Sequence, residues 1–169
     1  MLSAVLQKSD CAACRFCCAF RRCSLWETPL FPAETAQKYT APSRPFSALT
    51  VNGAPCAKME LEGRYQTDDS EEEAPCFFLK EGVGCTLNEN EKPFDCKIWP
   101  LRVMRQGERL VIALTPTCPV IQKVGTQKMK ELVQNGLADV IFDYAAAHPF
   151  IIKAYREDFP VLCVKEKEI

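Results

Sequence analysis

Residues 101–114 read Leu101-Arg102-Val103-Met104-Arg105-Gln106-Gly107-Glu108-Arg109-Leu110-Val111-Ile112-Ala113-Leu114. The apolar-rich runs Leu101–Met104 and Arg109–Leu114 flank a polar link that contains Gly107, and this pattern predicts a β-hairpin. The run from Leu110 to Leu114 has no polar side chain, so we expect the second strand to be buried. The hairpin supplies the β part of the predicted fold.

On the C-terminal side of the hairpin the apolar spacing becomes helical. Apolar residues recur three or four positions apart, which indicates one buried helical face: Met129, Leu132, Val133, Leu137, Val140, Ile141 and Tyr144. Gly136 is expected to divide or weaken this helix. A short strand is expected at Phe159–Val164.

On the N-terminal side a helix is expected at Phe31–Tyr39 and an extended region at 46–66 with a turn near Asn52-Gly53. The predicted fold class is therefore α+β, a small cysteine-rich metal-binding domain with a β-hairpin and C-terminal helices. We assign the metal-binding domain to residues 1–118 and a C-terminal helical extension, packed on it, to residues 119–169.

Cysteine content is the unusual feature of the composition, with eleven cysteines in 169 residues. So many cysteines indicate disulfides in an oxidising compartment or metal ligation in a reducing one. The first ten residues have neither the cationic start nor the apolar run of a signal peptide. An odd cysteine count also argues against a full set of disulfides. We therefore expect a cytoplasmic protein with reduced, metal-binding thiols.

Charge and hydropathy give no indication of a nucleic-acid partner or of a membrane. The chain has 21 basic and 22 acidic residues, so its total charge gives no indication of nucleic acid. No stretch approaches the roughly 18 uncharged apolar residues of a membrane helix. We expect a protein partner of unknown identity, no nucleic acid and no membrane.

The first cysteine motif is Cys11-Ala12-Ala13-Cys14-Arg15-Phe16-Cys17-Cys18, or C-x2-C-x2-C-C. Short C-x2-C loops let two thiolates approach one metal, and two successive units resemble the start of the ferredoxin run. Side chains of adjacent residues diverge, so Cys17 and Cys18 are awkward ligands for one mononuclear site. They suit different iron atoms, two separate sites, or a ligand beside a structural thiol.

The second cysteine motif is spread over residues 75–100, with its sulfurs at Cys76, Cys85 and Cys96. Each has an apolar or aromatic residue nearby that would shield a cluster from water. Gly84 would let the backbone approach closely, and Pro93 would start a helical turn that carries Cys96.

Together the two motifs resemble the CxxCxxCC cysteine-cluster family, also called a zinc- or iron-chelating domain. The resemblance covers residues 11–101 and comprises the first motif followed by Pro75-Cys76 with Phe78, Gly84-Cys85 with Leu87, and Pro93 with Cys96 and Pro100. Lys92, Lys97 and Trp99 depart from the family pattern, but none of these departures replaces a cysteine. The resemblance implies binding of zinc or iron.

Some relatives of that family are described as flagellin lysine N-methylase-type proteins, but this activity is not carried over. No G-x-G-x-x-G follows a predicted strand, and Gly82-Val83-Gly84 is too short a match.

Cys118 precedes Pro119 and resembles the remote ligand of the ferredoxin pattern. With the seven motif cysteines it makes eight thiolates, enough for two four-ligand sites. The predicted ligands are Cys11, Cys14, Cys17, Cys18, Cys76, Cys85, Cys96 and Cys118. Cys23 and Cys56 are expected to be buried structural thiols, and Cys163 to lie in the core. His148, the single histidine, excludes zinc sites built on several histidines.

Cations near the motifs would offset the charge of a thiolate centre. Four thiolates around Zn²⁺, or around a cubane of core charge +2, leave about −2. The nearby cations are Arg15, Arg21, Arg22, Lys97 and Arg102, although these residues are equally consistent with ordinary surface charge. Asp95 is expected to be a helix cap, with a contact behind the metal ligands as the alternative.

The favoured function is an iron–sulfur protein with a 4Fe–4S cluster and a redox, electron-transfer or maturation-partner role. Clustered C-x2-C-x2-C favours this over a zinc ribbon, which usually has two separated C-x2-C pairs. One alternative is a structural zinc-binding interaction module. The other is an iron-dependent enzyme that acts on a protein or peptide. Whether the chain is an enzyme stays open, and no catalytic residue is proposed.

Overall fold

Helices and strands are interspersed along the chain in the computed structural model, which describes residues 1–166. The helices are α1 (Lys8–Cys14), α2 (Ala33–Tyr39), α3 (Phe94–Ile98), α4 (Pro119–Val124), α5 (Thr126–Leu132) and α6 (Ala138–Ala147). Short 3₁₀ turns occupy Phe16–Cys18, Glu62–Arg64 and Pro149–Ile151, and a wide turn spans Val133–Leu137. The strands are β1 (Ala19–Arg21), β2 (Phe46–Val51), β3 (Ala54–Met59), β4 (Glu73–Pro75), β5 (Leu79–Lys80), β6 (Gly84–Cys85), β7 (Leu101–Gln106), β8 (Arg109–Leu114), β9 (Lys153–Ala154) and β10 (Val161–Lys165).

The largest sheet has the strand order β10-β8-β7-β9. β7 and β8 are antiparallel and joined by Gly107-Glu108, so the predicted hairpin is confirmed. Its second strand is buried from Val111 to Leu114, also as predicted. β10 pairs antiparallel with β8, and β9 pairs parallel with β7.

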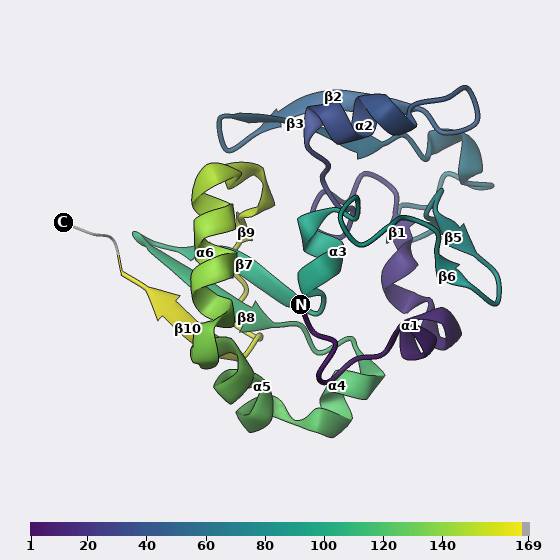
Figure 1. Ribbon diagram of the computed structural model, residues 1–169. Coiled ribbons are helices and arrows are strands. Elements are labelled where there is room, and N and C mark those ends of the chain that lie inside the picture. The colour runs from purple at the N-terminus through teal and green to yellow at the C-terminus, as the bar shows by residue number, and fades with distance from the viewer. Residues whose placement is uncertain (167–169) are drawn as a thin grey trace.

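The two faces of this sheet pack against different clusters because side chains alternate along a strand. Val103 and Ile112 belong to the main core, together with Ile141 and Phe142 of α6, which lies across the sheet (Figure 1). Met104 and Val111 face a smaller cluster on the other side. Arg102 shares that second face, at the end of β7 nearest the cysteines.

The predicted C-terminal helix is divided at Gly136, whose φ is +101°. Met129 and Val133 before the break, and Ile141 after it, are fully buried. Val140 is 51% exposed, so its predicted place on the buried face is wrong. The adjacent Ile141, which the same spacing also places on the buried face, is the residue that is buried.

The segment after residue 118 is not wholly helical, because it supplies β9 and β10 to the sheet that contains the hairpin. The main core likewise combines residues from both predicted parts. The structure as a whole is a mixed α and β fold, in agreement with the predicted class. The division into two domains at residue 118 stays a prediction.

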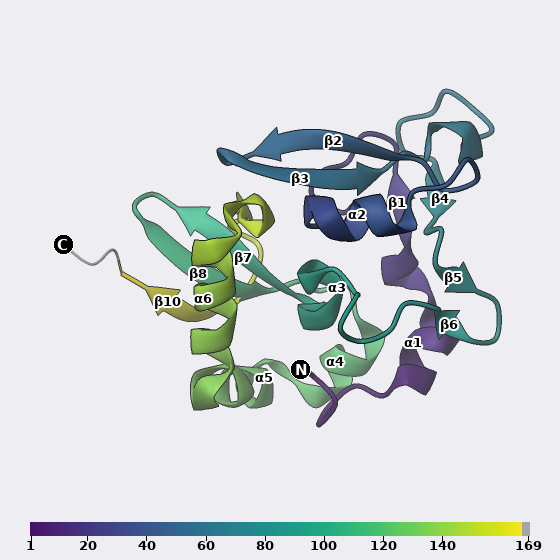
Figure 2. The same cartoon turned by 45° about the horizontal axis from the view of Figure 1, so that its top comes forward.

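The rest of the chain forms small two-stranded sheets beside the large one (Figures 1 and 2). β2 and β3 form a hairpin around Asn52-Gly53, and α2 packs beside it, at the positions predicted for a turn and a helix. A second core beneath them includes Phe31, Met59 and Phe78. Within residues 1–166, no helix has both the length and the apolar character needed to cross a membrane.

Gly136 yields a test of the helix break. Gly136→Ala should lower the free energy of unfolding by about 1–2 kcal/mol, because a side chain strains a backbone with positive φ. Gly63→Ala is the matched control, since a Cβ meets nothing within 4 Å at either site and Gly63 has no positive φ. Urea unfolding measures both, and equal effects would contradict the assigned backbone strain.

Candidate metal centre

Backbone pairing joins the first cysteine motif to the second. β1 follows directly after Cys18 and pairs antiparallel with β4, which ends directly before Cys76. The Cys76 N–H donates a hydrogen bond of 2.8 Å to the Cys18 carbonyl. This ladder holds the ends of the two motifs side by side.

A close contact between α1 and β6 makes a second join. Gly84 has φ +83°, and a Cβ on it would lie 3.2 Å from the Ala12 Cβ. A larger residue would therefore push α1 away from the β5–β6 hairpin. The predicted close approach at Gly84 is confirmed, and it places Cys85 beside the helix that carries Cys11 and Cys14.

The third cysteine of the second motif is carried by a short helix. α3 begins after Pro93, as predicted, and carries Cys96 in its central turn. The chain around the first motif turns back at Arg15, which has φ +55° and caps α1. These two local features bring Cys17 and Cys96 toward the same space.

Six of the eight predicted ligands border one cavity of about 90 Å³: Cys11, Cys17, Cys18, Cys76, Cys85 and Cys96. Phe20, Phe31, Phe78 and Leu87 form much of its wall. The other two predicted ligands, Cys14 and Cys118, border a neighbouring cavity of about 20 Å³ that Cys11 and Cys17 also line. We call these the main cavity and the small cavity.

The remaining cysteines lie outside both cavities. Cys56 is 1% exposed in the main core, as predicted, and Cys163 is partly buried against that core. Cys23 is exposed with φ +59°, so the prediction of a buried thiol is wrong. His148 stacks on Tyr144, with ring centroids 4.1 Å apart. All eleven cysteines carry free thiols.

The sulfurs border a common space without converging on one point. Within residues 1–166, no three His, Cys, Asp or Glu side chains lie close enough together to hold one metal ion as they stand. Each cysteine has three staggered χ1 wells that move its sulfur while the backbone stays in place. Any ligation in these cavities requires such rotations.

Burial and neighbouring groups raise the pKa of four thiols that border the main cavity, those of Cys11, Cys17, Cys76 and Cys96. Burial raises the pKa of Cys76 from 9.0 to about 12, and nearby Cys85 adds to the shift. Burial also raises the pKa of Cys11 to about 11. For Cys17, the hydrogen bond with Cys18 and then burial raise the pKa.

Cys96 combines accessible surface with a raised pKa. It borders the main cavity and a second hollow, which gives the thiol accessible area. Protein atoms nevertheless surround it, and this burial raises its pKa well above the usual value. Loss of these protons would accompany metal binding, since thiolates are the ligands.

A buried charge cluster adjoins the main cavity. Arg102 and Asp95 are each 2% exposed, and Lys153 is 7% exposed. Arg102 Nη1 lies 3.4 Å from Asp95 Oδ1, and Lys153 Nζ lies 3.5 Å from Asp95 Oδ2. Two cations thus face one carboxylate, although burial lowers the pKa of Lys153.

Arg102 also borders the main cavity directly. Its guanidinium lies 4.4 Å from the centroid of the Trp99 ring. Its buried Nε–H has no hydrogen-bond partner, and the same holds for Asp95 Oδ2 beside it and for Arg22 Nε outside the main cavity. A buried donor without a partner is costly, so an acceptor in the adjoining space would stabilise Arg102.

Among the cations expected near the centre, Arg102 borders the main cavity. Lys92, which sequence reasoning missed, borders it too, and its place directly before Pro93 was the available signal. Arg21 instead pairs with Glu27 and Glu71, and Arg22 with Glu62. Arg15 lines the small cavity, and Lys97 lines the second hollow that Cys96 borders.

The prediction that Asp95 caps α3 is wrong. Asp95 makes no side-chain cap bond to α3, and its carboxylate pairs with Arg102 and Lys153 instead. Lys153 gave no sequence signal because it lies far along the chain from either motif.

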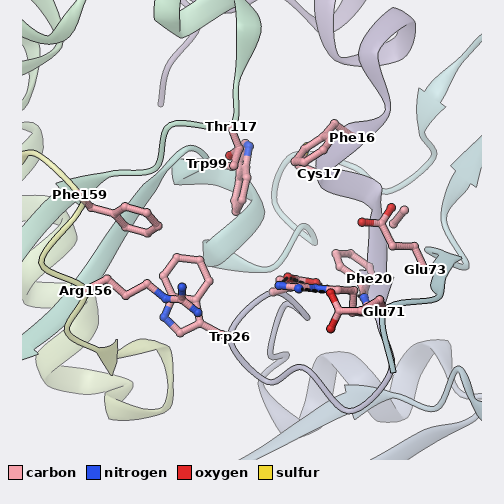
Figure 3. A pocket seen from close by; sticks show the side chains of 13 residues that line it. Phe16, Cys17, Phe20, Trp26, Glu71, Glu73, Trp99, Thr117, Arg156 and Phe159 are labelled. Atoms are coloured by element: carbon pink, nitrogen blue, oxygen red, sulfur yellow. Dashed lines mark hydrogen bonds and ion pairs between the residues drawn. The ribbon is translucent and has the colours of Figure 1, made fainter. Parts of the chain in front are cut away.

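An open cavity of about 340 Å³ lies against the other side of Cys17. Figure 3 shows Trp26, Arg156 and Phe159 on one side and Phe20, Glu71 and Glu73 on the other, with Phe16, Cys17 and Trp99 along the edge between them. Cys17 borders this cavity as well as the main one. The open cavity therefore reaches to the edge of the cysteine cluster.

Comparisons with protein families, with curated proteins and with solved structures find no match to this chain. The resemblance to the CxxCxxCC family stays a prediction that rests on the motifs.

Thiol alkylation tests the burial of the main cavity. In reduced, metal-free protein at pH 8, iodoacetamide should modify Cys76 about 100-fold or more slowly than in the same chain unfolded in urea, because the raised pKa depletes the thiolate. The Cys76 rate should keep rising toward pH 12. Exposed Cys23 is the internal control, and peptide mass spectrometry follows both. Equal protection of the two cysteines would show that Cys76 is not buried in this way.

Proposed function

We propose that this chain binds an iron–sulfur cluster, of the 4Fe–4S type, in the main cavity and serves in electron transfer or as the redox or maturation partner of another protein. The observation that carries the proposal is the buried Arg102, whose Nε–H has no partner, beside six cysteines from two distant segments. The proposal explains why these groups share one space.

Charge supports an anionic occupant. A buried charge without a counter-charge costs several kcal/mol, on the order of 3–5 when one partner of a pair is missing. Asp95 compensates one of the two buried cations, Arg102 and Lys153. Lys92 at the cavity wall is already paired with Glu89 and adds no uncompensated charge. A four-thiolate centre with net charge of about −2 would provide the missing negative charge, and its sulfurs would accept the free Nε–H.

The cavity wall supports a cluster rather than a single ion. A single ion held by four thiolates fits in the gap between the four sulfurs. A cubane also brings further iron and sulfide atoms, which need additional cavity volume. The main cavity has a volume of about 90 Å³ and a largely aromatic and aliphatic wall. Such a wall shields a cluster from water and thereby influences its reduction potential.

The location of the cavity supports a redox role. When bound, an iron–sulfur cluster accepts and donates single electrons. Cys17 lies between the main cavity and the open cavity, so an electron donor or acceptor at the open side would come close to the centre. Residues of this chain would hold the cluster, shield it and balance its charge.

Metal and sulfide content test the proposal. Protein purified without oxygen should contain iron and acid-labile sulfide and absorb near 400 nm. Cys85→Ser should lower the iron content to less than about half, whereas Cys23→Ser, at an exposed cysteine outside the cavities, should leave it unchanged. Stoichiometric zinc without sulfide would favour the structural zinc module instead. Folded protein free of iron and zinc would contradict both the iron–sulfur proposal and the zinc alternative.

Arg102 yields a second test. Arg102→Gln should speed release of iron to a chelator by about 10–100-fold, because the hydrogen bond and charge behind the ligands are lost. Asp95 would still face Lys153, so no carboxylate is left unpaired. Arg105→Gln on the same strand is the control, since Arg105 is exposed. Equal rates of iron release for the two variants would show that Arg102 does not stabilise the bound centre.

A further inference from the structure

We infer that the chain holds a second, separate four-thiolate metal centre, formed in the small cavity by Cys11, Cys14, Cys17 and Cys118. This inference rests on the proposed function and divides its ligands between two centres. The main centre would then use Cys18, Cys76, Cys85 and Cys96.

The cavities themselves suggest the division. Four of the predicted ligands border the main cavity but not the small one: Cys18, Cys76, Cys85 and Cys96. Cys14 and Cys118 border the small cavity but not the main one. Cys11 and Cys17 border both, and assigning them to the small cavity gives each centre four thiolates, the number that closed zinc and iron–sulfur sites use.

Local backbone structure favours the same grouping in the first motif. Cys11 and Cys14 are three residues apart on α1, so their side chains are neighbours on one helix face. The left-handed turn at Arg15 then leads into the 3₁₀ turn that carries Cys17. Cys17 can thus meet the helix face, as in a C-x2-C-x2-C ligand run.

Cys17 and Cys18 need not serve the same metal. The two thiols are hydrogen-bonded to each other in the structure, so ligation of different metals requires one of them to rotate about χ1. The Cys18 carbonyl accepts the Cys76 N–H, so Cys18 is fixed beside the second motif. A boundary between the centres at the Cys17–Cys18 peptide bond keeps Cys18 with Cys76 and leaves Cys17 with the residues of the small cavity.

Cys118 is the cysteine that a distant part of the chain contributes to the lining of the small cavity. It is the N-cap residue of α4 and is 9% exposed, in a position set by the chain that leaves β8. Trp99 borders both cavities. The small cavity has a volume of about 20 Å³, so the volume argument used for the main cavity favours a single thiophilic ion such as Zn²⁺ here.

Native mass spectrometry of the full chain, purified without oxygen, tests the division together with iron, zinc and sulfide analysis. Wild-type protein should carry two centres. Cys14→Ser and Cys118→Ser should each lose the same centre and keep the other, while Cys18→Ser and Cys76→Ser should lose the opposite one. The mass lost with Cys14→Ser distinguishes a zinc ion from a cluster.

Control variants keep the result decisive. Cys23→Ser and Cys163→Ser, outside both cavities, should keep both centres, and circular dichroism checks the fold of every variant. Cys118 is buried, so its variant can fail to fold. Cys14 is exposed, and the Cys14→Ser result then decides alone.

Two outcomes would overturn the second centre. A folded Cys14→Ser protein that keeps the full wild-type metal content shows that the small cavity holds none. Loss of all metal in both folded Cys14→Ser and Cys76→Ser shows one shared centre. In both cases the metal-binding proposal survives, whereas wild-type protein without any metal overturns that proposal itself.

Discussion

The hydrogen bond from the Cys76 N–H to the Cys18 carbonyl is the contact on which the candidate centre depends. It extends the β1–β4 pairing to the last cysteine of the first motif and the first cysteine of the second. The packing of Ala12 against Gly84 adds a second attachment, at α1 and β6. Neither motif alone would border the whole main cavity, so these two backbone contacts turn two local cysteine clusters into one.

The large sheet contributes to the same site through charge. β7 carries Arg102 to the cavity wall, β9 carries Lys153, and α3 provides Asp95 between them. These three residues come from three elements, and two of the elements belong to the sheet that organises the main core. A change in strand register by one residue would turn Arg102 to the opposite face. The fold and the electrostatics of the centre are therefore linked through the hairpin.

Features with a local cause could be predicted from the sequence. The hairpin follows from two apolar runs around Gly107, the helix break from Gly136, and the start of α3 from Pro93. Features set by distant contacts could not. Asp95 has the pattern of a helix cap, but Lys153 and Arg102 compete for its carboxylate. Val140 fits the helical spacing, but the buried face of α6 passes through Ile141, Phe142 and Ala145 instead.

Extended X-ray absorption at the iron edge would test the central claim most directly, because it identifies the atoms bound to the metal. For protein kept free of oxygen, this account predicts sulfur as the bound atom, at about 2.3 Å, with a second iron nearby. A shell of nitrogen or oxygen atoms around iron, with no sulfur, would contradict thiolate ligation by the two cysteine motifs.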